Sequence, residues 1–215
     1  MIFEASGLLF DNDGVLVDSM GTVDGSWGEW SKTYSPGFQI SYEHHGRRAS
    51  EIVASLVGDE LFEEALARAG LSRLELELTH LTTAMPGAKK LLESLESGTW
   101  TVVTSAGRDL GTSRLKAAGL PVPKELVCAD DVSSGKPNPE PYLMGAKKLS
   151  LDISECIVFE DAPSGVAAGV AAGARAVIGI GEEVLDSKAD VVISSLEGIS
   201  FLGGKLELPD SKRLR

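Results

Sequence analysis

Two aspartates, Asp11 and Asp13, are the residues best suited to chemistry in this chain of 215 residues. They follow an apolar run over 8–10 and lead directly into Gly14. Such a run is typical of a buried strand in an α/β sheet, and ligands collect just beyond the carboxyl ends of such strands. Two neighbouring carboxylates repel each other unless a cation or a proton lies between them, so the pair indicates a divalent metal or a raised pKa. Residues 11–14 would equally suit a solvated acidic turn or part of a calcium loop.

A hydroxyl and a backbone amide follow a second predicted strand, over 99–104. Ser105 and Ala106 come next in the chain, followed by Gly107. Their O–H and N–H groups are suited to binding the oxygens of a phosphate. The alternative is that Ser105 simply N-caps the next helix.

A second acidic pair and a lysine complete the set of candidate residues. Glu160 and Asp161 follow a strand expected over 156–159, and with Asp11 and Asp13 they would make an oxygen-ligand cluster suited to Mg²⁺. A solvated turn is the other interpretation of this pair. Lys136 lies among glycine and prolines that restrict its backbone, which favours an electrostatic partner for the carboxylates over an ordinary surface charge.

The elements needed to position these residues alternate between helix and strand. We expect helices over 88–95, 109–118, 140–149 and 164–173, and strands over 99–104, 126–129, 156–159, 176–180 and 190–193. This alternation predicts an α/β fold with a doubly wound, Rossmann-like parallel sheet and crossover helices. From residue 203 onward the chain is polar, and we expect a solvated end.

A polar, helix-like segment over 18–83 interrupts this pattern after the first strand. Apolar spacing predicts helices over 51–56, 60–69 and 71–81, with Gly70 as a C-cap. Trp27 and Trp30 lie one helical turn apart and are expected to pack inside this segment. We therefore divide the chain into an α/β core over 1–17 and 84–215 and a small inserted α-helical domain over 18–83.

Composition narrows the range of functions. A net charge of −12 argues against binding to nucleic acid or to an anionic membrane surface, and no apolar run is long enough to cross a membrane. The N-terminus lacks the pattern of a secretory signal, so a cytoplasmic protein is expected. Cys128 and Cys156 lie in apolar surroundings and are expected to be reduced core residues.

The four candidate segments together resemble the motifs of the haloacid dehalogenase (HAD) superfamily of phosphohydrolases. The matching segments are FDNDGVLVDS, VVTSAG, SSGKPNPEPY and VFEDAPSGVAAG. Within the superfamily, the chain is similar to sugar and polyol phosphatases, including the glycerol phosphate and 2-deoxyglucose-6-phosphate phosphatases. Val15 stands where threonine is commoner in the family, at a position that is mainly structural. The presence of Asp13 argues against a dehalogenase, which lacks this second carboxylate.

The resemblance implies a role for each core motif residue in a Mg²⁺-dependent hydrolysis of phosphomonoesters. Asp11 would be the nucleophile that forms an aspartyl-phosphate, and Asp13 would be the general acid and base. Ser105, the Ala106 amide and Lys136 would bind the phosphate or offset its charge. Mg²⁺ would be held by Asp11, the backbone carbonyl of Asp13 and Asp161, with Glu160 orienting a metal-bound water.

The resemblance also implies that segment 18–83 is a cap that closes over the active site. In it, the segment over 44–48 is similar to the family's cap signature, which would place Arg48 toward the substrate with His45 beside it and Arg47 exposed. Asp18 and Ser19 would lie at the hinge. The expected partner is a small phosphate ester, and we expect a monomer.

Two other functions remain open from the sequence. A phosphosugar mutase of the β-phosphoglucomutase type shares the fold, the cap and all four motifs, and Arg48 would then bind a second phosphate group. A non-catalytic phosphoacceptor domain would also carry an acidic cluster and a lysine on a doubly wound sheet. It would need neither Asp13 nor a cap.

Overall fold

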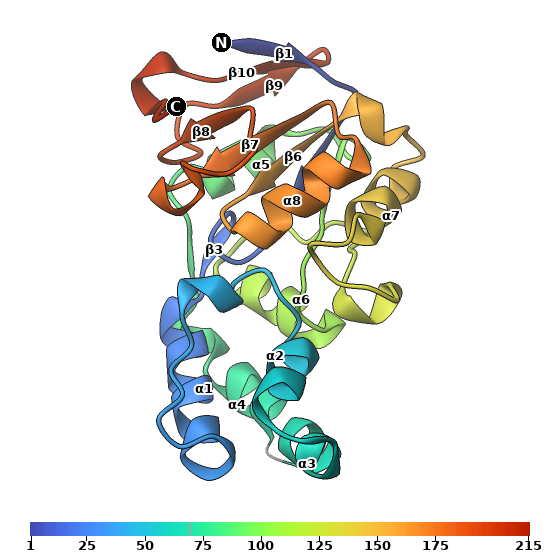
Figure 1. Ribbon diagram of the computed structural model, residues 1–215. Coiled ribbons are helices and arrows are strands. Elements are labelled where there is room, and N and C mark those ends of the chain that lie inside the picture. Colours follow the sequence, from blue (N-terminus) through green and yellow to red (C-terminus); the bar gives the residue numbers. More distant parts are fainter. Residues whose placement is uncertain (69) are drawn as a thin grey trace.

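The fold is built on a five-stranded parallel sheet, which lies in the upper half of the molecule as viewed in Figure 1. The computed structural model describes residues 1–68 and 70–215. In spatial order the strands are β5 (Trp100–Val102), β2 (Gly7–Phe10), β6 (Cys156–Glu160), β7 (Ala176–Ile180) and β8 (Val191–Ile193). Consecutive strands in this order are parallel, which places all their carboxyl ends at one edge.

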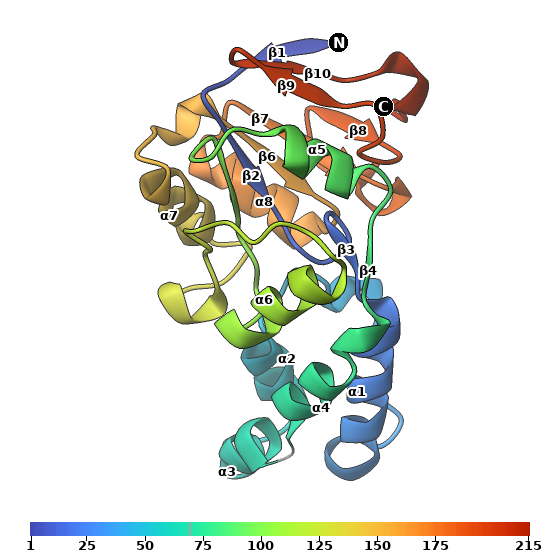
Figure 2. The same ribbon diagram turned by 180° about the vertical axis from the view of Figure 1, so that it is seen from behind.

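Helices cover both faces of this sheet because its strands are apolar on both sides. In β2, Leu8 and Phe10 pack into one core layer while Leu9 packs into the other. The first layer is covered by α5 (Ala88–Ser94), seen in front in Figure 2. The second is covered by α7 (Glu140–Lys148) and α8 (Pro163–Ala172), seen in front in Figure 1. The predicted doubly wound α/β fold is confirmed.

One expected strand, over 126–129, is absent from the sheet. Only a single parallel bridge joins Val127 to Val103 beyond β5. The chain turns directly afterwards into a 3₁₀ helix over Ala129–Asp131, so the ladder has no room to extend. Its apolar residues are nevertheless buried, which is why the segment has the composition of a strand.

The C-terminal segment is also not the solvated end that its polar composition predicts. It forms β9 (Ser200–Leu202) and β10 (Lys205–Glu207), which pair with β1 (Ile2–Glu4) in an antiparallel sheet of order β1-β10-β9. Leu206 is fully buried and Leu208 nearly so. A few well-spaced apolar residues therefore suffice to attach this segment to the core.

The segment over 18–83 forms a group of helices that lies below the sheet in Figure 1, and we call it the helical insertion. It contains α1 (Met20–Tyr34), α2 (Ala49–Leu56), α3 (Asp59–Glu63) and α4 (Leu71–Glu77). The helix expected over 60–69 is split between α3 and a π-helical turn over Glu64–Arg68, and its last residue lies outside the described residues. Trp27 and Trp30 pack edge to face in the interior of this group, as expected.

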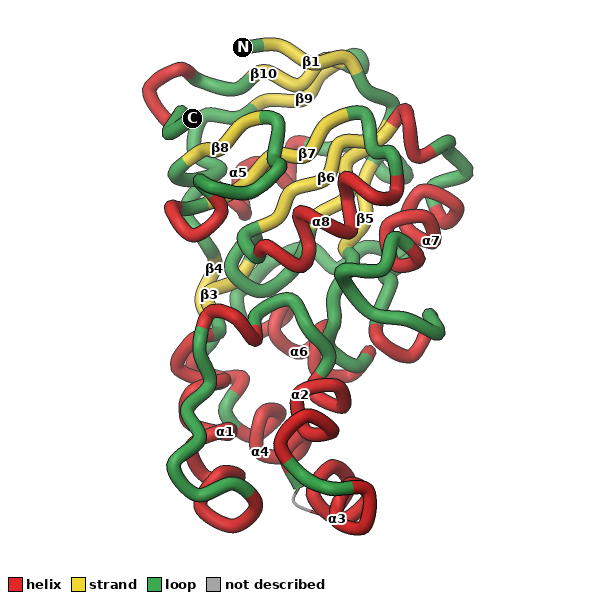
Figure 3. The backbone as a smooth tube through the Cα atoms, viewed as in Figure 1, coloured by secondary structure: helices red, strands yellow, loops and turns green. Residues whose placement is uncertain are grey.

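Two short antiparallel strands join the helical insertion to the sheet. They are β3 (Val17–Asp18) and β4 (Thr83–Ala84), which lie side by side in Figure 2. The chain segments that lie between the sheet and the insertion are mostly loops, shown in green in Figure 3. The remaining helix, α6 (Arg108–Ala117), follows β5 and lies beside this region.

The other regular elements are short 3₁₀ helices. They lie at Tyr42–His44, Thr79–Leu81, Ile153–Glu155, Glu182–Val184 and Asp210–Lys212. Among the described helices, none is long and apolar enough to cross a membrane.

Candidate active site

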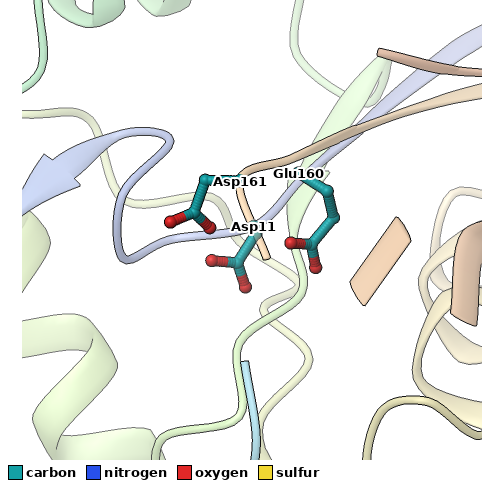
Figure 4. Close-up of side chains that lie close together, drawn as sticks. All are labelled: Asp11, Glu160 and Asp161. Carbon is teal, nitrogen blue, oxygen red and sulfur yellow. The ribbon is translucent and has the colours of Figure 1, made fainter. Parts of the chain in front are cut away.

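Three neighbouring strands bring the candidate residues to one edge of the sheet. Asp11 follows β2, Ser105 follows β5 on one side of it, and Glu160 ends β6 on the other side, with Asp161 next in the chain. Figure 4 shows the three carboxylates of Asp11, Glu160 and Asp161 gathered together. The strand order thus explains why residues far apart in the sequence converge here.

Lys136 lies at the centre of this group, with its side chain completely buried. Its Nζ donates to Asp11 Oδ1 at 2.5 Å, to Glu160 Oε1 at 2.7 Å and to the Val103 carbonyl at 3.0 Å. All three ammonium protons are therefore used. Burial by itself would lower the pKa of Lys136, but the two carboxylates outweigh it and raise the pKa, so the lysine is charged.

The three carboxylates still carry more negative charge than Lys136 offsets. Ligand atoms from Asp11, Glu160 and Asp161 lie within 4.8 Å of one another, and all three residues are buried. Burial, with a further contribution from the charge of Glu160, raises the pKa of Asp11 to about 7 against the attraction of Lys136. A buried oxygen cluster of this charge is suited to a hard divalent cation.

The turn after Asp11 makes room for this cluster. Gly14 has φ +83°, in the left-handed region that glycine favours, and a Cβ there would lie 1.9 Å from Asp161 Oδ2. Gly165 plays a similar part at the start of α8, where a Cβ would lie 1.8 Å from Glu160 Oε1. At both positions the absence of a side chain leaves room for an acidic residue of the cluster.

Asp13 lies apart from the three-carboxylate cluster, with its side chain about one quarter exposed. Its Oδ1 accepts a hydrogen bond from Ser19 Oγ at 2.6 Å and lies 3.0 Å from Arg114 Nη1. No donor among the described residues is bonded to Oδ2. Asp13, which the motif predicts to exchange protons, thus has Oδ1 bound within the protein, while Oδ2 is available to exchange a proton.

Ser105 and Ala106 lie at the same edge, with their donors engaged within the protein. Ser105 Oγ donates to the Gly46 carbonyl of the helical insertion at 2.6 Å, and the Ala106 amide donates to Thr104 Oγ1 at 3.1 Å. Ser105 does not cap the following helix, because the N-cap of α6 is Gly107. The hydroxyl instead connects the sheet edge to the insertion.

The expected cap residues lie in a loop that is seated on the sheet edge. The His45 carbonyl accepts from Ser164 Oγ at 3.0 Å, while Arg48 donates to the Val132 and Ser133 carbonyls at 2.7 and 3.1 Å. Burial lowers the pKa of the His45 imidazole, which favours its neutral form. Arg47, expected to be exposed, is half-buried because this loop packs against the sheet edge.

A cavity of about 750 Å³ lies between the sheet edge and the helical insertion. Its polar wall includes Asp11, Asp13, Ser105 and Arg114, and the insertion contributes His45 and Arg48. The other wall is largely apolar, made by Val23, Trp27, Ile40, Ile52, Leu66 and Leu76. The cavity can hold a small molecule with one anionic end.

Sequence reasoning missed three residues of this region. Tyr142 is fully buried and its hydroxyl donates to Glu160 Oε1 at 2.6 Å. It belongs to the same motif segment as Lys136, and this position could have identified it from the sequence. Arg114 and Glu75 form a buried pair at 3.2 Å between α6 and α4. Each has the pattern of an ordinary exposed helical residue, so nothing local in the sequence distinguished them.

Two buried cysteines lie away from this chemistry. Cys128 and Cys156 are free and buried, as expected, and burial raises their pKa values to about 11 and about 12. Both thiols are therefore protonated and inert near neutral pH.

Comparison with known proteins places this geometry among phosphatases. A family model described as haloacid dehalogenase-like hydrolase matches residues 8–178. Hexitol phosphatase A of Escherichia coli is 36% identical over 200 residues, covering 90% of this chain and 93% of that protein. Glycerol-1-phosphate phosphohydrolase 2 of Saccharomyces cerevisiae is 32% identical over 225 residues, covering 95% of this chain and 88% of that protein.

A solved structure shares most of this architecture. A candidate β-phosphoglucomutase from Bacteroides vulgatus superposes with a TM-score of 0.75 and 32% sequence identity. The match covers 90% of this chain and 85% of that one. The similarity therefore includes the helical insertion as well as the parallel sheet.

Proposed function

This chain belongs to the haloacid dehalogenase-like hydrolase family, and on that premise we propose that it is a Mg²⁺-dependent phosphatase of small sugar or polyol monophosphates. The observation that carries the proposal is Asp11, which lines the cavity, is held by a buried lysine and lies beside two further carboxylates. We assign the cap to the helical insertion and the catalytic core to the rest. A monomeric, cytoplasmic enzyme is part of the same proposal.

In the first step, a carboxylate oxygen of Asp11 attacks phosphorus and the bond from phosphorus to the substrate alkoxide breaks. Oδ1 of Asp11 is bonded to Lys136, which leaves Oδ2 for the attack. Asp13 gives its proton to the departing alkoxide through its available oxygen. The products of this step are the alcohol and an aspartyl-phosphate on Asp11.

In the second step, water attacks the same phosphorus and the bond to Asp11 breaks. Asp13, now ionised, takes the proton from that water. Inorganic phosphate leaves, and both carboxyl groups return to their starting states. Lys136 offsets the charge shared by Asp11 and the phosphoryl group throughout, because without it two anions would have to approach each other in a buried site.

The residues present fit a magnesium ion. Asp11 and Asp161 would hold it with the Asp13 backbone carbonyl, and Glu160 would orient its water, being itself bonded to Lys136 and Tyr142. The raised pKa of Asp11 and the space left by Gly14 beside Asp161 both support a cation here. When bound, Mg²⁺ would offset the charge of the phosphate and help to orient it.

Phosphate would lie against Ser105, the Ala106 amide and Lys136. Ser105 is bonded to the cap carbonyl of Gly46, so a phosphate oxygen would take the place of that carbonyl as its acceptor. The hydroxylated part of the substrate would extend toward His45, Arg48 and the cavity walls. The names of the two polyol phosphatases support a small polyol in this space.

Release of inorganic phosphate from a panel of esters tests the proposal. The panel should contain sorbitol 6-phosphate, glycerol 1-phosphate, 2-deoxyglucose 6-phosphate and a nucleoside monophosphate, each with Mg²⁺ and with excess chelator. We expect turnover of the sugar or polyol esters, dependent on Mg²⁺ and absent in Asp11→Asn. No turnover of any ester with Mg²⁺ would refute the proposal, and a stable aspartyl-phosphate without turnover would indicate a phosphoacceptor domain instead.

A β-phosphoglucomutase activity is the second candidate, favoured by the similarity to the Bacteroides vulgatus structure. A mutase must hold one phosphate at the cap while the other is transferred at the core. Arg48 is the cap cation that the motif suggests, but its two terminal nitrogens already donate to the Val132 and Ser133 carbonyls. Conversion of β-glucose 1-phosphate to glucose 6-phosphate without phosphate release would favour the mutase.

A further inference from the structure

Arg114 connects the proposed acid and base, Asp13, to the cap. It comes from α6 of the core, and only 3% of it is exposed. One terminal nitrogen, Nη1, lies 3.0 Å from Asp13 Oδ1, and the other, Nη2, lies 3.2 Å from Glu75 Oε1 in α4 of the cap. Its Nε has no hydrogen-bond partner among the described residues, so the guanidinium is divided between these two carboxylates.

The contacts to Asp13 are arranged on one side of its carboxyl group. Ser19, at the start of the cap segment, and Arg114 both reach Oδ1. The hydrogen bond from Ser19 and the ion pair with Arg114 both restrain this one oxygen and leave the other oxygen to exchange a proton.

Glu75 makes this arrangement depend on the position of the cap. It is 6% exposed, and burial raises the pKa of its carboxyl group against the attraction of Arg114. If the cap moved away, Glu75 would leave the guanidinium, and Arg114 would lose one of its two anionic partners. Breaking a buried charge pair is strongly unfavourable. The pair between Arg114 and Glu75 therefore stabilises the closed position of the cap, and the closed cap in turn keeps Arg114 in place.

We propose that Arg114 is a positioning residue that orients Asp13 for proton transfer, and that Glu75 holds it in place only when the cap is closed. The proposal rests on the proposed phosphatase function. The proposal predicts that the loss of activity in variants of Arg114 and Glu75 depends on the leaving group of the ester. Alkoxides need a proton from Asp13 to depart, whereas p-nitrophenolate departs readily without one.

The test compares alkyl and aryl esters in Arg114→Met, Arg114→Lys and Glu75→Gln. For sorbitol 6-phosphate and glycerol 1-phosphate, we expect Arg114→Met to lower kcat/KM by about 100-fold or more, the range of general acid catalysis. For p-nitrophenyl phosphate, we expect a loss below about tenfold in kcat/KM, since this constant reports only steps up to release of the alcohol. Arg114→Lys, which keeps the charge, should restore part of the alkyl activity, and Glu75→Gln should show the same selectivity with a smaller loss.

A second readout follows from the role of Asp13 in the second step. In Arg114→Met, p-nitrophenol should appear in a burst equal to the enzyme concentration, followed by slow turnover, because the aspartyl-phosphate forms but water is poorly activated. The matched control is Arg73→Met, which removes an exposed arginine of α4 whose partner is Glu77. It should leave both esters unaffected.

The outcomes separate the two proposals. If the wild-type protein hydrolyses these esters but Arg114→Met and Glu75→Gln lower alkyl and aryl kcat/KM equally, or not at all, the positioning role is wrong. A wild-type protein inactive on every ester refutes the phosphatase function and this inference with it. Glu75→Gln nearly preserves the size and shape of the side chain. If Arg114→Met does not fold, the comparison of alkyl and aryl esters can therefore still be made with Glu75→Gln.

Discussion

Asp11 and Asp13 lie two residues apart, yet their surroundings differ. Asp11 is 4% exposed and is bonded to a buried ammonium, whereas Asp13 is about one quarter exposed and is held by a hydroxyl and a guanidinium. The end of strand β2 explains the difference. Asp11 comes directly after the strand and is packed at the edge of the sheet, whereas Asp13 lies in the turn that follows. Distinct surroundings allow one carboxyl to attack phosphorus and the other to exchange protons.

Amide substitutions should separate these two roles. Asp11→Asn and Asp13→Asn should each lower phosphate release by at least about 100-fold, but for different reasons. Asp11→Asn removes the nucleophile and should form no covalent phosphate. Asp13→Asn keeps the nucleophile and should accumulate aspartyl-phosphate with p-nitrophenyl phosphate, measured by intact-protein mass spectrometry. Covalent phosphate on the Asp11→Asn protein would contradict the assignment.

Gly14→Ala tests the space beside the proposed metal ligand Asp161. A methyl group there would lie 1.9 Å from Asp161 Oδ2, and φ of +83° strains any residue other than glycine by about 1–2 kcal/mol. We expect the Mg²⁺ concentration for half-maximal phosphate release to rise at least about tenfold, as for other changes around metal ligands. Gly28→Ala is the matched control, because nothing lies within 4 Å of a Cβ at Gly28 in α1. Unchanged Mg²⁺ dependence in Gly14→Ala would show that Asp161 is not a ligand.

At the scale of elements, the helices and strands of the parallel sheet were predictable and the antiparallel sheet was not. The five parallel strands are short apolar runs between helices, and that pattern is local. Strand β10 has only one buried residue, Leu206, between two exposed charged ones, and its partner β1 comes from the other end of the chain. A three-residue strand with one apolar residue gives too weak a local signal to be predicted in a polar tail.

Leu206→Ala should show how much this tail contributes to stability. Leu206 is fully buried in the core beside β1, so the substitution should lower the free energy of unfolding by about 2–5 kcal/mol, measured by urea denaturation. The control is Leu202→Ala in β9 of the same sheet, where Leu202 is 80% exposed; its effect should stay within about 0.5 kcal/mol. Equal effects of the two substitutions would mean that the tail is only loosely attached to the core.

At the scale of the whole molecule, the candidate active site is a cavity between two parts of the chain, and it concentrates negative charge in a protein of net charge −12. Lys136 is the cation inside the carboxylate cluster, and Arg114 lies beside Asp13. Folding thus gathers buried acids before any metal or substrate arrives. The stability of the molecule should therefore respond to pH and to Mg²⁺ together.

The direction of this response follows from Asp11. Its pKa is raised from 3.8 to about 7 in the folded protein, so between these values the metal-free folded state holds a proton that the unfolded chain has released. The contribution of Asp11 to stability is therefore present at about pH 4 and is lost as the pH rises to about 7. Mg²⁺ requires the ionised carboxylate, so its apparent affinity should be about tenfold weaker at pH 6 than at pH 8.

Thermal unfolding with and without Mg²⁺ measures this linkage. At a fixed, non-saturating Mg²⁺ concentration, the rise in Tm should be larger at pH 8 than at pH 6. Asp11→Asn, which cannot ionise at this position, should show a smaller rise with little dependence on pH. A rise in Tm that is the same at both pH values in the wild-type protein would contradict the raised pKa of Asp11 as the cause.

Taken by itself, the sequence determined which strand ends carry chemistry. Asp11, Ser105, Glu160 and Asp161 were identifiable because strand runs are local patterns and parallel strands end at a common edge, and Lys136 was identifiable from its glycine and proline neighbours. Only the tertiary structure decided how these groups are held and what surrounds them. Arg114 and Glu75 are 39 positions apart, on helices of different parts of the molecule, and they meet because the cap is seated on the core. Such contacts depend on the path of the chain through space, which residue spacing along one helix does not encode.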